Sequence, residues 1–207
     1  MMQHFLKVSA LMIAMTISAG AQAASWNESV QGELSSNALA PSTLMLDLGS
    51  NSIIGSFNPQ GVYDSDYLTV IVPTGTQLSS LLYGSNFVIN DARSFIGVDI
   101  GTTIDLTPTP TSQFGLHGYA HIPIGSSVGT DFLPEIGNGF GSEGFTGPLA
   151  AGTYTFWMQE TSGALGTYSW DFVVSTAPVP EPDTYAMLLA GLGLMGATAR
   201  RRKQKQS

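Results

Sequence analysis

The sequence contains no cysteine among its 207 residues, and only seven of its residues are Lys or Arg. The lack of cysteine excludes disulfide bonds, zinc–thiolate sites and thiol catalysis, so the fold must depend on its hydrophobic core. The shortage of basic residues excludes nucleic acid as a partner of the body of the chain, because phosphate recognition needs clustered Lys and Arg.

The few basic residues lie almost entirely at the two ends of the chain. Lys7 is near the N-terminus, five more fall within residues 200–205, and only Arg93 lies between. All fifteen carboxylates lie between residues 28 and 183. An acidic body of this kind either keeps an exported protein soluble and monomeric or attracts divalent cations and cationic polymers, and the sequence leaves both open.

The N-terminus has the three parts of a secretory signal peptide. Lys7 provides the positive region, residues 8–20 form an apolar run, and Ala21-Gln22-Ala23 presents small residues at a cleavage site. This order predicts a signal peptide over residues 1–23, removed by signal peptidase, and a chain exported across the inner membrane.

A second apolar run lies near the C-terminus, where residues 184–199 carry no charge. As a helix this run would be about 24 Å long, which is short of the hydrocarbon thickness of about 30 Å. Flanking Arg and Lys side chains can extend to the membrane surface, so we predict a marginal transmembrane helix. The basic tail at 200–207 is expected to stay cytoplasmic, which places the acidic body outside the inner membrane.

A Pro-rich linker at 177–183 precedes this helix and contains Val179-Pro180-Glu181-Pro182. Together with the short Gly-rich apolar span and Arg-Arg-Arg-Lys, it closely resembles the PEP-CTERM sorting signal of exported bacterial proteins. The resemblance implies recognition by an exosortase-type membrane protease, transient anchoring, and transfer to the cell surface or the extracellular biofilm and exopolysaccharide matrix. The two prolines also hold Glu181 in an extended segment that a protease can bind. The alternative is an ordinary membrane anchor with a Pro-rich stalk.

The body at 24–176 lacks helical periodicity, and Gly, Pro, Ser, Thr and Asn recur every eight to twelve residues between short β-prone segments. This pattern predicts an all-β domain, a sandwich or barrel of about nine short strands. The expected strands are 29–34, 42–48, 52–57, 67–72, 77–83, 94–99, 115–122, 152–160 and 167–175.

Two stretches of the body are similar to the bacterial pre-peptidase C-terminal domain. They are "IIGSFNPQGVYDSDYLTVIVPTGTQLSSL" at 53–81 and "PLAAGTYTFWMQE" at 148–160. The order Gly-Ser, Asp-x-Asp-Tyr, Val-Pro-x-Gly-Thr and Ala-Gly-Thr-Tyr carries the similarity. It implies a jelly-roll-like β-sandwich without catalytic activity, of a kind in which some members bind calcium or polysaccharide. Residues 84–147 depart from the pattern.

The last two predicted strands, "GTYTFWMQE" and "GTYSWDFVV", are separated by "TSGALG", which predicts a β-hairpin. Their alternating aromatic residues are expected in the core. Trp157 falls on the more polar face of its strand, so it is a candidate surface contact for a sugar ring.

Asp64 and Asp66 alternate in "YDSDY", in a predicted turn before a strand. Calcium binds six to eight oxygen ligands from carboxylates and loop carbonyls, so this pair is a candidate calcium site, with Glu28 or Asp171 as possible further ligands. The alternative is an Asx turn in which each carboxylate accepts hydrogen bonds from nearby backbone N–H groups.

Catalytic motifs are weak in this sequence. Ser127 lies in a G-x-S-x-G match, but Pro134 and several glycines interrupt any following helix, and the body's two histidines precede it. On a strand, His117 and His121 would lie about 13 Å apart, too far to share one metal. The sequence therefore favours a non-enzymatic exported protein without a cofactor, except possible calcium. The alternatives are a calcium-stabilised adhesion or carbohydrate-binding module and a secreted glycan hydrolase using Asp64 or Glu143.

Overall fold

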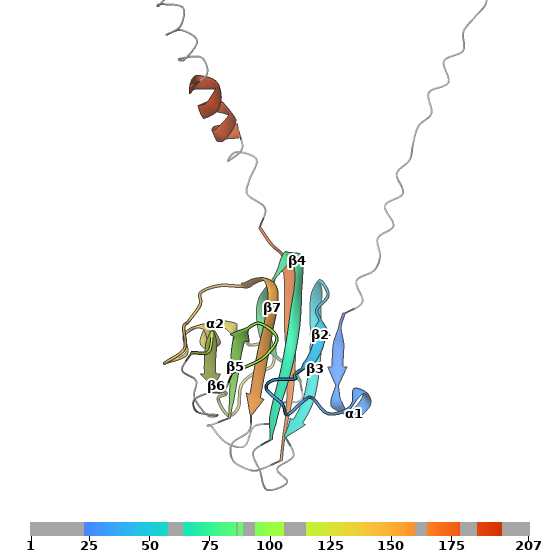
Figure 1. The fold of residues 1–207 in the computed structure, drawn as a ribbon. Coiled ribbons are helices and arrows are strands. Elements are labelled where there is room, and N and C mark those ends of the chain that lie inside the picture. Colours follow the sequence, from blue (N-terminus) through green and yellow to red (C-terminus); the bar gives the residue numbers. More distant parts are fainter. Residues whose placement is uncertain are drawn as a thin grey trace, which may run out of the picture.

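The computed structural model of the chain describes residues 23–57, 64–85, 87–88, 94–105, 115–159, 165–178 and 186–195. The predicted signal peptide apart from Ala23, the Val179–Pro182 motif and the basic tail lie outside the described residues. The elements in chain order are β1 (Ser25–Asn27), α1 (Glu28–Gln31), β2 (Ser42–Met45), β3 (Gly49–Phe57), β4 (Ser65–Tyr83), β5 (Phe95–Ile100), β6 (Gly118–His121), α2 (Leu133–Gly137), β7 (Leu149–Gln159) and β8 (Gly166–Thr176) (Figure 1).

The eight strands form one mixed sheet in the order β1-β3-β8-β4-β7-β5-β6, with β2 also paired to β4. The pairs β1–β3 and β2–β4 are parallel, and the other pairs are antiparallel. The all-β prediction is confirmed, with one continuous sheet and few helices. The jelly-roll-like sandwich remains a prediction.

The long strand β4 lies at the centre of the sheet, between β8 on one side and β7 on the other (Figure 1). It pairs with β7 from Ser65 to Leu78 and with β8 from Thr76 to Tyr83. The register with β7 shifts between Val72 and Gln77, at the Pro-x-Gly-Thr sequence that predicted a turn between two strands. Pro and Gly interrupt the hydrogen bonding locally, but partners on both sides of the break keep the chain extended.

The predicted hairpin between the last two strands is wrong. Strands β7 and β8 are antiparallel to β4 and lie on either side of it, so they are not neighbours in the sheet. Strand β8 pairs instead with the whole of β3, from Gly49↔Val174 to Phe57↔Gly166. The pairing partners on β3 and β4 are distant in sequence, and the connecting segment gave no signal for them.

The N-terminal part of the body also differs from the prediction, since residues 29–34 do not form a strand. The Asn27 side chain accepts a hydrogen bond from the Ser29 N–H at 3.1 Å and caps the short helix α1. Gly32, with φ +94°, ends this helical turn. Glu28 and Glu33 therefore stand at opposite ends of a compact turn.

The core occupies both faces of the sheet. The main cluster contains Leu68, Phe156, Trp170 and Phe172 among its fully buried side chains. A smaller cluster on the opposite face of β4, β5 and β7 contains Tyr67, Phe95, Ile104, Leu116 and Trp157. The cluster members that lie on strands alternate along them, as period-two patterns predict, while others such as Ile104 and Leu116 come from the connecting segments.

Trp157 belongs to this smaller cluster and is only 2% exposed. Its ring stacks on Tyr67 with centroids 5.8 Å apart and meets Phe95 edge to face at 4.6 Å. The predicted sugar contact at Trp157 is therefore wrong. The face that looked polar in sequence is covered by the other members of this cluster, and the neighbouring Thr155 hydroxyl donates to the Gly101 carbonyl at 2.9 Å.

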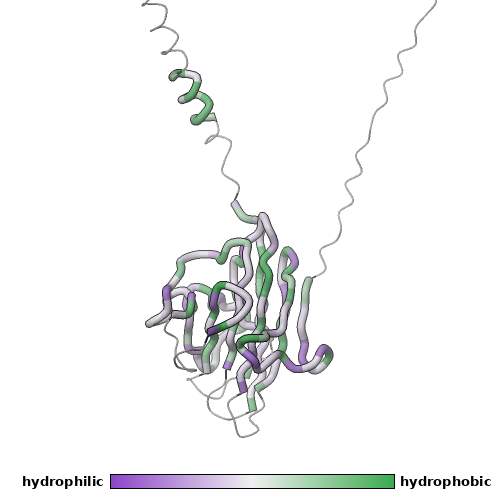
Figure 2. The backbone as a smooth tube through the Cα atoms, in the orientation of Figure 1, coloured by the Kyte–Doolittle hydropathy of each residue, from purple (hydrophilic) through white to green (hydrophobic). Residues whose placement is uncertain are grey.

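Residues 186–195 form a helix of exposed residues. The green colour of this helix in Figure 2 marks its apolar composition. Within the described part of the chain, no helix combines the length and apolar character needed to cross a membrane. The predicted transmembrane helix at 184–199 extends beyond the described residues, so it remains a prediction.

Candidate metal centre

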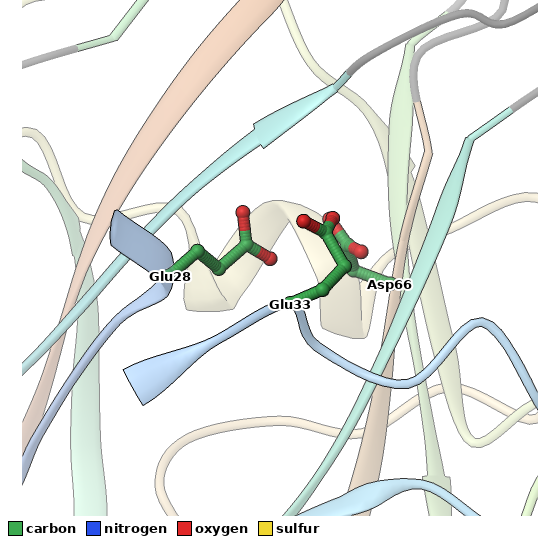
Figure 3. Close-up of side chains that lie close together, drawn as sticks. All are labelled: Glu28, Glu33 and Asp66. Atoms are coloured by element: carbon green, nitrogen blue, oxygen red, sulfur yellow. The ribbon is translucent and has the colours of Figure 1, made fainter. Parts of the chain in front are cut away.

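Three carboxylates converge at one end of the main core (Figure 3). Glu28 is the first residue of α1, Glu33 follows that helix, and Asp66 lies near the start of β4. One oxygen of each carboxylate lies within 4.8 Å of the corresponding oxygens of the other two. We refer to these three side chains as the carboxylate cluster.

Backbone hydrogen bonds bring the separate segments of the cluster together. The Tyr67 N–H donates to the Ser35 carbonyl at 2.8 Å, which holds the chain after Glu33 against the start of β4. Two backbone N–H groups, one at the end of β3 and one after Glu33, hold the Glu28 carboxylate in place. Its Oε2 accepts from the Ser56 N–H at 2.7 Å, and its Oε1 accepts from the Leu34 N–H at 3.1 Å.

Asp66 is the buried member of the cluster, with an exposed fraction of 0%. Strand alternation directs its side chain to the same face as Leu68, toward the main core. Its Oδ2 accepts a hydrogen bond from the Tyr168 hydroxyl at 2.8 Å, whereas its buried Oδ1 has no hydrogen-bond partner among the residues that the structure describes. Gly55 leaves room for this contact, because a Cβ atom there would overlap the Tyr168 ring.

The carboxylates make each other harder to ionise. Burial raises the pKa of Asp66 to about 9, and the charge of Glu28 adds to this effect. Burial also raises the pKa of Glu28, although hydrogen bonds from Leu34 and Ser56 oppose the rise. The pKa of Glu33 is raised by burial and by the charges of Glu28 and Asp64.

No basic side chain from the described part of the chain can offset this repulsion, because every Lys and Arg lies outside those residues. The cluster can be relieved either by protons or by a bound cation. Its donors are all carboxylate oxygens, which suit a hard divalent ion such as calcium.

The predicted pair of Asp64 and Asp66 is only partly brought together in this cluster. Asp66 is a member, while Asp64 lies just before β4 and acts through its charge on the other carboxylates. The Asx-turn alternative is wrong for Asp66, because its partner Tyr168 is distant in sequence. Asp171 is not a member, since its carboxylate accepts from the Ser50 hydroxyl at 2.8 Å instead.

Sequence reasoning named Glu28 as a further ligand but missed Glu33. The available signal was the Asn27 cap followed by Gly32, which frames a short helical turn and not a strand. The bridge between Ser35 and Tyr67, which sets the position of Glu33, has no signal in the local sequence.

The other candidate residues lie apart from the cluster. Ser127 is in the loop between β6 and α2, where its carbonyl accepts from the Thr130 N–H at 3.1 Å. His117 Nδ1 lies 3.6 Å from a Glu143 carboxylate oxygen, and His121 Nε2 lies 2.7 Å from the Tyr119 hydroxyl. The two histidines therefore contact different partners.

Comparison with known families identifies the end of the chain. Residues 178–203 match the family model of the PEP-CTERM protein-sorting motif. The chain carries a PEP-CTERM sorting motif. This confirms the resemblance seen at Val179–Pro182, and it implies export, membrane-anchored sorting to the cell surface and processing by an exosortase-type system. No curated protein and no solved structure matched the chain. The resemblance of the body to the pre-peptidase C-terminal domain remains a prediction.

Proposed function

We propose that this PEP-CTERM protein is a non-enzymatic β-sheet protein of the cell surface or extracellular matrix, associated there with exopolysaccharide. The observation that carries the proposal is the order of the two parts. Strand β8 ends at Thr176, and the sorting motif begins at residue 178. The folded sheet is thus the cargo, and processing near the motif would leave all eight strands intact.

The attachment point of the motif supports this role. Strand β8 lies between β3 and β4 and pairs with β3 from Gly166 to Val174 and with β4 from Trp170 to Thr176. The Ala177 N–H also donates to the Gly75 carbonyl at 2.9 Å. A link to a membrane or to a matrix polymer at this end would therefore pull on a central strand of the sheet.

The predicted start of the mature chain also coincides with the start of the sheet. The Ala24 N–H donates to Asn51 Oδ1 at 3.2 Å, and its carbonyl accepts from the Ser52 N–H at 3.2 Å. Cleavage by signal peptidase after Ala23 would remove only residues that precede this first pairing. The predicted signal peptide and the sorting motif therefore flank the described strands in the sequence.

The alternative function is a secreted glycan hydrolase, because glycosidases use two carboxyl groups about 5–9 Å apart and the cluster brings carboxylates close together. The surroundings of the cluster favour the non-enzymatic role. Asp66 is fully buried, and both oxygens of Glu28 accept backbone hydrogen bonds. Glu143, the other candidate, instead faces His117 beside β6. No hydrolysis of the producing organism's own exopolysaccharide by the purified protein is expected.

The sorting step can be tested by following the full-length chain in a bacterium with and without its exosortase. A triple variant, Pro180→Ala with Glu181→Ala and Pro182→Ala, serves as the second arm. We expect wild type in the surface or extracellular fraction, and uncleaved protein in the membrane fraction when either the exosortase or the motif is lost. Equal release of all three forms would contradict the proposal. Co-sedimentation of the released protein with purified exopolysaccharide then tests the association.

A further inference from the structure

We propose that Glu28, Glu33 and Asp66 bind one divalent cation, calcium, and that this ion fastens the N-terminal segment to the central strand β4. The proposal does not depend on the proposed function, because it concerns the folded sheet wherever that sheet is delivered. It follows from the positions of the three carboxylates and from two features of the described residues, which leave one buried oxygen without a partner and include no Lys or Arg.

The spacing of the cluster is close to that of ligands around one calcium ion. Calcium–oxygen distances of 2.3–2.6 Å allow two ligand atoms on one ion to be up to about 5 Å apart. Each of the three carboxylates presents one oxygen within 4.8 Å of the chosen oxygens of the other two. Magnesium, with bonds near 2.0–2.1 Å, needs ligands no more than about 4.2 Å apart and usually keeps several waters.

The unpartnered oxygen of Asp66 is the observation that points to a ligand. A buried acceptor without a donor destabilises a fold, and such atoms are rare in native proteins. The Tyr168 hydroxyl donates a hydrogen bond to Oδ2, but Oδ1 is buried and has no hydrogen-bond partner among the described residues. A cation in the cluster would satisfy this oxygen and neutralise the adjacent charges of Glu28 and Glu33 at the same time.

The alternative occupant of the cluster is a proton, held by Asp66 and shared with its neighbours. Protonation also relieves repulsion between carboxylates, but it provides no link that depends on a metal. The two explanations therefore differ in their response to calcium, and the experiment below separates them.

The ion would matter most for the segment that carries Glu28 and Glu33. Strand β1 is a three-residue edge strand, and the following helix α1 has no buried residue. Between the core contacts of Trp26 and Leu34, the turn that carries the two glutamates has no buried apolar side chain, and Val30 is 79% exposed. A cation shared with Asp66 would tie it to β4, which pairs with β2, β7 and β8.

The test uses the full-length chain, purified in detergent and stripped of metal with EDTA. Calorimetric titration with calcium should give one site with a Kd of about 10⁻⁴–10⁻³ M, the range of extracellular calcium modules. In 10 mM calcium the melting temperature should rise by about 3–10 °C. Magnesium at the same concentration should give a clearly smaller rise.

Two variants of the cluster and one matched control complete the experiment. Asp66→Asn keeps an oxygen for Tyr168 but removes the buried charge, and Glu33→Gln changes an exposed ligand and should not disturb folding. Both should lose the calcium-dependent shift, whereas Asp171→Asn, outside the cluster, should keep it. If Asp66→Asn does not fold, Glu33→Gln alone decides.

The absence of calcium uptake and of any melting shift in the wild-type protein would overturn the proposal. A full calcium response in Glu33→Gln, or equal loss in Asp171→Asn, would overturn the assignment of the ligands. An equal response to magnesium would overturn the choice of ion. None of these results depends on the exosortase experiment, so the two proposals fail separately.

Discussion

Replacing Asp66 with Asn should remove a fall in stability with rising pH that the metal-free wild-type protein shows. Asp66 is fully buried, and burial together with the charge of Glu28 raises its pKa from 3.8 to about 9. A carboxyl group whose pKa is higher in the folded state stabilises the fold below its unfolded pKa, and that stability is lost as pH rises toward the folded value.

The size of the effect follows from the difference between the pKa of Asp66 in the unfolded chain and its pKa in the folded chain. Between pH 5 and pH 8 the folded chain keeps a proton on Asp66 that the unfolded chain has released. The free energy of unfolding should therefore fall by about 4 kcal/mol across those three pH units, at 1.36 kcal/mol each. Asn does not titrate, so Asp66→Asn should lack this fall and be more stable than wild type at pH 8 in EDTA.

Urea unfolding followed by tryptophan fluorescence at pH 5, 6, 7 and 8 measures this difference, since Trp157 and Trp170 are buried in the folded state. The groups that shift the pKa of Asp66 are the carboxylates of Glu28, Glu33 and Asp64 and the Tyr168 hydroxyl. The variant Asp171→Asn is the control for the loss of a carboxylate elsewhere. A wild-type stability that rises from pH 5 to 8, or an equal fall in Asp66→Asn, would refute the reasoning. Calcium should flatten the wild-type fall, because it binds the deprotonated carboxylates.

Three further substitutions test the packing and the surface. Gly55→Ala should cost about 1–3 kcal/mol in the free energy of unfolding, measured in urea, because the new methyl group overlaps Tyr168; an unchanged value would contradict the close approach. Trp157→Ala should cost about 3–5 kcal/mol in the same assay, as expected for a core residue and not for a surface ligand contact. Phe140 is 86% exposed, so Phe140→Ala should change stability by less than about 0.5 kcal/mol while weakening co-sedimentation with exopolysaccharide; unaltered co-sedimentation would exclude this aromatic side chain as a contact.

The sequence alone predicted the all-β class and the position of most strands, because alternation and turn residues act locally. It did not predict how the strands pair. The Pro73–Gly75 stretch looked like a turn but lies inside β4, where β7 and β8 support the chain on both sides. The predicted β7–β8 hairpin was wrong for the same reason, since partners distant in sequence determine the order of the sheet.

The same limit applies to the carboxylate cluster. Asp66 was a candidate because of its acidic neighbour Asp64, and Glu28 was named as a possible partner. Glu33 was not, because only the contact between Ser35 and Tyr67 brings it to β4. The sorting motif was recognised fully, since its proline pair, apolar span and basic tail are contiguous in the chain.

The mass of the mature protein recovered outside the cell tests the central claim most directly. Export and exosortase processing predict a chain that begins at Ala24 and ends near Pro182, with β1 to β8 retained. Recovery of the intact 207-residue chain from the cytosol, with both ends uncut, would contradict the account.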